Sequence, residues 1–162
     1  MRSVLLLICV LLASACEFRV REPSGEEKNQ IVSEVLALTN EIRAAAEAAD
    51  ADGLFRHHSD AADAAHIIDG KRFSRGQMVN NYRDVYAGVA SQQINIGDPM
   101  VKVISPDLVL VVSQGTFTSN SKSGGALSGG VAWTYLWQKQ NEAWVLLHAH
   151  QSFPGPISPL GQ

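Results

Sequence analysis

Residues 131–153 read VAWTYLWQKQNEAWVLLHAHQSF and contain the clearest structural pattern in the chain. Apolar and aromatic residues alternate with polar ones on both sides of a polar stretch at 140–142, which is typical of a tight turn. The pattern predicts two strands, over 131–139 and 144–153, that pair as an antiparallel hairpin.

Two histidines stand out on the second of these strands. His148 and His150 are two residues apart, so an unbroken strand would place them on one face with Trp144, Leu146 and Ser152. Such a pair can bind a metal, transfer protons, or form hydrogen bonds inside a packed sheet. The last interpretation is the one we favour, and no metal site is expected.

The chain before the hairpin continues the sheet. Ile94 and Ile96 alternate with polar residues, Asp98-Pro99 breaks the run, and Val101 and Val103 alternate again. The segment 108–112 is apolar on both faces, which predicts a strand covered on both sides. The segment 119–130 is rich in Gly and Ser and is predicted to be a loop.

The first half of the chain has a helical period. Ser24 followed by Glu27, and Ser74 followed by Gln77, are capping-box patterns that each predict the start of a helix. A short helix over 54–58 and a short strand over 66–69 are predicted between them. Helices followed by a largely antiparallel sheet define the α+β class.

Length and composition limit the possible functions. The chain has 162 residues, 46% hydrophobic and 18% charged, which fits one globular domain. The net charge of -3 does not favour a nucleic-acid partner, because phosphate binding needs a basic surface. Both cysteines lie in the first sixteen residues, so the body is expected to contain no disulfide and no thiolate ligand.

The N-terminus is predicted to be an export signal. Residues 1–15 contain Arg2, an apolar run and a small-residue stretch that ends at Cys16. The stretch resembles a bacterial lipoprotein signal, which implies cleavage before Cys16 and a lipid anchor on it in the cell envelope. Ordinary secretion with cleavage at the same bond is the alternative. Residues 16–25 form a predicted tether, and Glu17 mildly favours the outer membrane over the inner one.

The order of elements and the ending together resemble a known family. The spacing Trp137-x6-Trp144-x3-His148-x-His150-x-Ser152 is similar to the final hairpin of SnoaL-like polyketide cyclase relatives, and to the association domain of calcium/calmodulin-dependent kinase. The resemblance implies the nuclear transport factor 2-like, or cystatin-like, fold, in which a cone-shaped curved antiparallel sheet packs against three N-terminal helices.

The resemblance also sets the domain limits and the oligomeric state. It places the domain at 26–153 and leaves 154–162 as an irregular tail. In this fold one face of the sheet lines a pocket and the other commonly pairs two subunits, so a homodimer is expected.

The resemblance suggests where a site would lie. In enzymes of this fold the segment after the second helix often supplies an acid or a base, which makes Asp60 a candidate general base, paired with His150 across the pocket. The predicted ligand-binding residues are Tyr82, His58, Trp133 and His148, whose aromatic and imidazole groups suit a small-molecule pocket.

Three functions remain open at this stage. The leading hypothesis is an exported domain that binds a small, largely apolar molecule without a cofactor. The second is a SnoaL-like enzyme that catalyses proton transfer, such as an isomerase, dehydratase or cyclase, in which Tyr82 donates to the developing oxyanion. The third is an envelope scaffold with a filled cone. A carboxylate–histidine pair inside a cavity would favour the enzyme, and a cavity without that pair would favour the binding domain.

Overall fold

The structure is a computed structural model that describes residues 21–153 and 158–160. The predicted signal peptide and the predicted lipidation site at Cys16 lie outside these residues. Within the described ranges no helix is long and apolar enough to cross a membrane.

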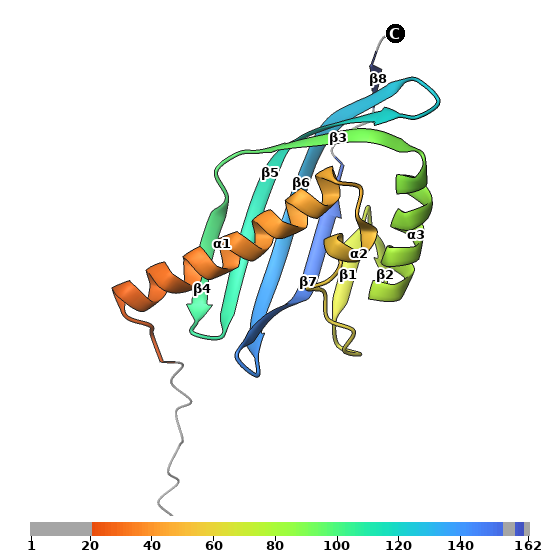
Figure 1. The fold of residues 1–162 in the computed structure, drawn as a ribbon. Helices are drawn as coiled ribbons and strands as arrows, with labels where there is room; N and C mark the ends of the chain where they lie inside the picture. Colours follow the sequence, from red (N-terminus) through yellow and green to blue (C-terminus); the bar gives the residue numbers. More distant parts are fainter. Residues whose placement is uncertain (1–20, 154–157, 161–162) are drawn as a thin grey trace, which may run out of the picture.

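Three helices cover one face of a curved mixed sheet, so the α+β prediction is confirmed (Figure 1). The helices are α1 (Gly25–Glu47), α2 (Ala51–Leu54) and α3 (Arg75–Ala87). The strands are β1 (Ala65–Ile68), β2 (Lys71–Phe73), β3 (Val89–Ile96), β4 (Met100–Ser105), β5 (Leu108–Ser121), β6 (Ala126–Gln140), β7 (Ala143–Ser152) and β8 (Ser158–Leu160).

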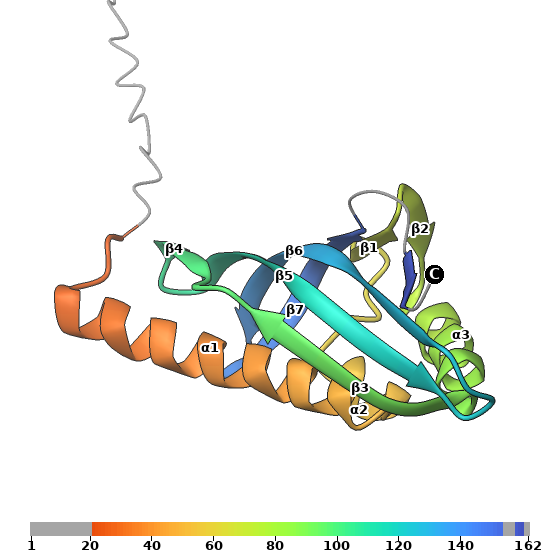
Figure 2. The same ribbon diagram turned by 90° about the horizontal axis from the view of Figure 1, so that it is seen from above.

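The sheet runs in the order β2-β1-β7-β6-β5-β3, with β4 also paired to β5 and β8 to β6. Every pairing is antiparallel except β1 with β7, which is parallel. Figure 2 shows α1 running across one side of the sheet, with α3 near its far end.

Both predicted capping boxes are present. At the start of α1 the backbone N–H of Glu27 donates to Ser24 Oγ at 3.2 Å, and the Glu27 carboxylate accepts from the Ser24 N–H. At the start of α3 the N–H of Gln77 donates to Ser74 Oγ at 3.2 Å, and Gln77 Oε1 accepts from the Ser74 N–H at 2.8 Å. Each reciprocal pair satisfies two backbone donors that the helix leaves without partners.

The second helix was predicted too late in the chain. It spans Ala51–Leu54 and not 54–58, because the Asp50 carboxylate accepts from the Gly53 N–H at 2.9 Å and caps it. The sequence also missed β2. Asp69 and Gly70, with φ of 47° and 77°, turn the chain so that β2 pairs with β1.

The loop predicted at 119–130 is mostly strand. β5 continues to Ser121 and β6 begins at Ala126, so only a short turn separates them. Gly129 pairs with Phe117 in the sheet, and a glycine suits this position because a Cβ there would lie 3.1 Å from the Phe117 ring. The tail was also predicted to be wholly irregular, yet β8 pairs with the start of β6.

A β-bulge in β7 overturns the predicted alternation of the last strand. Trp137 pairs with Leu146 and Leu136 pairs with His148, so Leu147 is an extra residue with no partner of its own. An extra residue shifts the side-chain period of 2 and turns every later side chain to the opposite face.

The face exchange separates residues that the sequence placed together. Trp144 and Leu146 face the core before the bulge, whereas Ala149 and Gln151 face it afterwards. His148 is half-buried and His150 exposed, and both follow the outer alternation of the strand. The prediction that Trp144, Leu146, His148, His150 and Ser152 share one face is therefore wrong.

Candidate functional site

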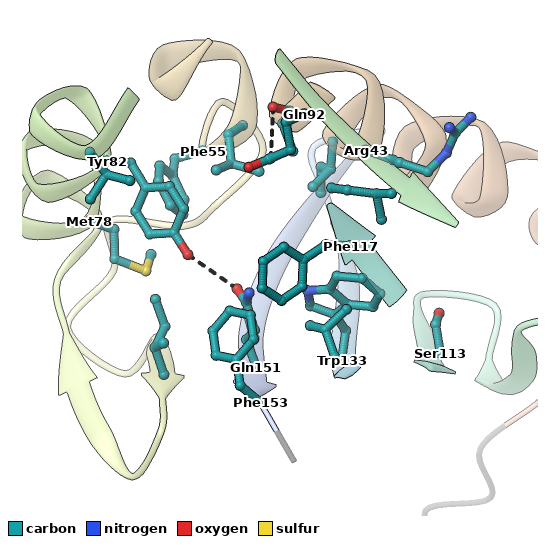
Figure 3. Close-up of a pocket in the computed structure, with 18 of the residues that line it drawn as sticks. Arg43, Phe55, Met78, Tyr82, Gln92, Ser113, Phe117, Trp133, Gln151 and Phe153 are labelled. Atoms are coloured by element: carbon teal, nitrogen blue, oxygen red, sulfur yellow. Dashed lines mark hydrogen bonds between the residues drawn. The ribbon is translucent and has the colours of Figure 1, made fainter. Parts of the chain in front are cut away.

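A cavity of about 400 Å³ lies between the helices and the inner face of the sheet (Figure 3). Its walls come from the second half of α1, the end of α2, one side of α3, and β1, β3, β5, β6 and β7. Two lining side chains are largely exposed, Val85 at 60% and Leu127 at 46%. They place the mouth of the cavity between α3 and the start of β6.

One wall of the cavity is a chain of aromatic rings that meet edge to face. Phe55 contacts His58 and Tyr82, with ring centroids 5.0 Å apart in each pair, and Tyr82 contacts Tyr86 at 5.4 Å. Edge-to-face packing is the favoured arrangement of aromatic pairs, so the rings hold one another in place. This wall is largely apolar.

The sheet supplies the opposite wall. Trp133 and Tyr135 project inward from β6, where each is only 9% exposed. Phe117 from β5 packs against Phe153 with ring centroids 5.5 Å apart. Strands β5, β6 and β7 therefore add further aromatic and apolar side chains to the lining, and Ala149 on β7 is the smallest of these.

A few polar groups interrupt this surface. The Tyr82 hydroxyl donates to Gln151 Oε1 at 3.4 Å, and Figure 3 shows the two side chains approaching one another across the cavity. Burial raises the pKa of Tyr82 to about 12, so its hydroxyl stays protonated at neutral pH. Gln92 donates to the Ala46 carbonyl at 3.0 Å. Burial also raises the pKa of Tyr135, which lines the same space.

The cavity presents no charge to a ligand. Arg43 is the one lining residue with a charged side chain, and its guanidinium donates to Glu47 at 3.0 Å. Figure 3 shows this guanidinium directed away from the cavity. No Asp or Glu occurs among the lining residues of the described chain.

His58 is the least satisfied polar side chain in the lining. It is 7% exposed, and its Nδ1 is enclosed without a hydrogen-bond partner in the described residues. The ring lies between those of Phe55 and His66, at 5.0 and 4.9 Å. Burial, with smaller contributions from His66 and nearby cations, holds the pKa of His58 well below its usual range, so the imidazole is neutral.

The structure brings three predicted site residues together. His58, Tyr82 and Trp133 all line the cavity. The other three lie elsewhere: His148 and His150 are on the outer side of β7, as described above. Asp60 is exposed and accepts from Arg75 at 3.0 Å in a separate recess at the start of α3.

Other lining residues were not predicted from the sequence. Phe55 falls in the segment assigned to the second helix, and Phe117 precedes the expected loop. Gln151 was hidden by the bulge, since an unbroken strand would turn it outward. Tyr86 could have been predicted as a lining residue, because it follows Tyr82 at helical spacing.

Within 21–153 and 158–160, no group of three or more His, Cys, Asp or Glu side chains is placed so that it could hold a metal ion.

Comparisons with known proteins agree with this architecture. Residues 35–156 match the family model described as SnoaL-like domain. A search of curated proteins gave no match. A hexachlorocyclohexane dehydrochlorinase (LinA) Type2 superposes with a TM-score of 0.73 at 12% identity, over 85% of this chain and 94% of its own.

Two further structures have the same fold. A protein from Streptomyces avermitilis, provisionally described as a dehydratase of the NTF2-like family, gives a TM-score of 0.65 at 21% identity, over 77% of this chain and 97% of its own. A protein from Xanthomonas campestris, provisionally described as a calcium/calmodulin dependent protein kinase II association domain, gives 0.64 at 20% identity, over 76% and 88%. Identities this low establish the fold and not the activity.

Proposed function

From the premise that the chain belongs to the SnoaL-like domain family, with an NTF2-like fold, we propose that it binds a small, neutral, largely apolar molecule in its cavity. The observation that supports this most is the combination of about 400 Å³ of space with an aromatic lining that presents no charge. Cavities of this size and composition are typical of small-molecule sites.

The proposed ligand is neutral because a charged one would lose its hydration without compensation. Moving an ionised carboxylate into an apolar site is highly unfavourable unless a cation or several donors meet it. Arg43 is paired with Glu47, and the imidazole of His58 is neutral. An anion would therefore find no counter-charge in the lining.

The positions of Asp60 and His150 favour ligand binding over proton-transfer catalysis. The enzyme hypothesis required a carboxylate and a histidine facing each other in the cavity. Asp60 is paired with Arg75 in another recess, and His150 is on the outer side of the sheet. The binding hypothesis needs only the cavity and its lining.

Equilibrium dialysis of the purified protein against fluorene and fluorene-9-carboxylate tests this proposal. The two compounds share a three-ring skeleton and differ in charge. We expect fluorene to bind at least about tenfold more tightly, as a desolvated charge costs well over the 1.4 kcal/mol that a tenfold difference represents. Equal affinity for both, or no binding of fluorene, would contradict the proposal.

The oligomeric state is a separate proposal: two copies pair through the outer face of the sheet. Leu110 on β5 and Leu136 on β6 are register partners, and both are half-buried on the side opposite the helices. Val112 lies one step along the same face. Light scattering should give the mass of a dimer, and Leu136→Asp should give the mass of a monomer. A monomeric wild-type protein would refute this pairing.

Export and anchoring are proposed from the leader alone. A lipid on Cys16 would hold the domain at the envelope through the tether, with the outer membrane favoured by Glu17. The intact mass of the mature protein should show diacylglycerol and acyl additions that disappear in Cys16→Ser. A mature mass without additions would favour ordinary secretion.

A further inference from the structure

The environment of His58 carries an inference about the ligand itself, and this inference rests on the proposed function. Neither nitrogen of the ring has a hydrogen-bond partner among the described residues. Nδ1 is enclosed between neighbouring side chains, whereas Nε2 is not enclosed. Because His58 lines the cavity and is 7% exposed, Nε2 is the nitrogen that can meet a bound molecule.

The enclosure of Nδ1 selects the tautomer. A neutral imidazole carries one proton, and the nitrogen with the proton is a donor while the other is an acceptor. A buried N–H without an acceptor is rarer in proteins than an acceptor left without a donor. The ring of Phe55 and the ring of His66 flank His58 and offer no oxygen to an Nδ1 proton. The proton therefore belongs on Nε2, the ring nitrogen that is not enclosed.

A second donor faces the same space. Gln151 uses Oε1 to accept from Tyr82, which leaves its amide N–H groups without a partner in the described residues. Figure 3 shows the amide nitrogen of Gln151 turned toward Phe117 and Trp133. The one cation in the lining, Arg43, is paired with Glu47, so the donors that remain for a ligand are neutral.

We propose that the ligand is a neutral ring compound with a carbonyl or ether oxygen that accepts a hydrogen bond from His58 Nε2–H. The oxygen satisfies a donor that a bound ligand would otherwise cover without giving it a partner. The aromatic walls then cover the apolar skeleton. A hydrocarbon would leave the donor unsatisfied, and a carboxylate would meet no counter-charge.

The test compares 9-fluorenone with fluorene, which differ by one carbonyl on the same three-ring skeleton, by equilibrium dialysis. The measured quantity is the affinity for fluorenone divided by the affinity for fluorene, in wild type and in His58→Phe. We expect this ratio to fall about fivefold to tenfold in the variant, which is the range for one neutral hydrogen bond. Because the same two compounds are used with wild type and variant, the difference in their hydration free energies cancels when the two affinity ratios are compared.

His57→Phe is the matched control, because His57 is the adjacent residue and does not line the cavity. The ratio should be unchanged in this control. An unchanged ratio in His58→Phe, or an equal fall of the ratio in His57→Phe, overturns the inference. In either case the proposed function still stands if wild-type protein binds fluorene. Failure of both compounds to bind wild-type protein overturns both.

A measurement on wild-type protein avoids dependence on the variant's folding. Long-range ¹⁵N–¹H correlation spectra of histidine-labelled protein distinguish the two imidazole tautomers. We expect the proton of His58 on Nε2. A proton on Nδ1 would turn an acceptor to the cavity and overturn the inference.

Discussion

The imidazole rings of His58 and His66 pack against each other with centroids 4.9 Å apart, and neither carries a charge at neutral pH. His66 is 1% exposed, and its Nε2–H donates to the Ser59 carbonyl oxygen at 3.0 Å. Burial lowers the pKa of both rings below the usual 6.5. The pair forms part of the wall between the cavity, which His58 lines, and the recess that His66 lines.

The lowered pKa values predict a loss of stability in acid. Above about pH 7.5 both histidines are almost wholly neutral in the folded and the unfolded chain, so they add little pH dependence. Below that pH the unfolded chain binds protons first, and the free energy of unfolding should fall as the pH is lowered. Urea unfolding between pH 7.5 and 5 measures this dependence.

His58→Phe should make the acid dependence shallower, because one of the two groups that resist protonation is removed. His150→Gln replaces an exposed histidine outside this buried pair and serves as the control. The explanation fails if the two variants have the same slope.

Asp60→Asn should not affect ligand binding. The carboxylate pairs with Arg75 outside the cavity, and it is 68% exposed. Exposed ion pairs contribute at most about 1 kcal/mol, so the free energy of unfolding should change by less than that. Dialysis with fluorene and urea unfolding check the two parts. A tenfold loss of fluorene affinity would indicate that Asp60 does contribute to the ligand site.

Ser74→Ala should destabilise the protein by about 1 kcal/mol, because it removes the capping oxygen at the start of α3. Helix α3 supplies Met78, Tyr82 and Tyr86 to the cavity wall. Since the cap is local and does not touch the cavity, fluorene affinity should stay within about twofold of wild type. Urea unfolding measures the stability, and dialysis measures the fluorene affinity. An unchanged free energy of unfolding would show that the cap does not stabilise the protein.

Features fixed by local chemistry could be predicted from the sequence. The two capping boxes depend on residues three apart, so Ser24 and Ser74 identified the starts of α1 and α3. The turn at Asn141 and Glu142 was also predicted, and both residues have the positive φ that a tight hairpin requires.

Features that depend on pairing between distant strands could not be predicted from the sequence. The bulge at Leu147 appears only when β7 is paired with β6, and it decides that Gln151 faces the cavity and His150 does not. His58 is similar, because its burial depends on a bridge to Leu146, far away in sequence. The sequence therefore supported the fold better than the site.

If a ligand binds in the cavity, filling the cavity with a side chain should abolish binding. Ala149 lines the cavity from β7 and is 8% exposed, so Ala149→Phe places a ring in the space that a ligand would occupy. Ala143→Phe adds the same bulk at an exposed position in the hairpin and serves as the control. Fluorene binding is measured by equilibrium dialysis on wild type and both variants. We predict that Ala149→Phe lowers the affinity at least about tenfold and that Ala143→Phe leaves it unchanged. Equal affinities in all three folded proteins would contradict the account, because the ligand would then bind elsewhere.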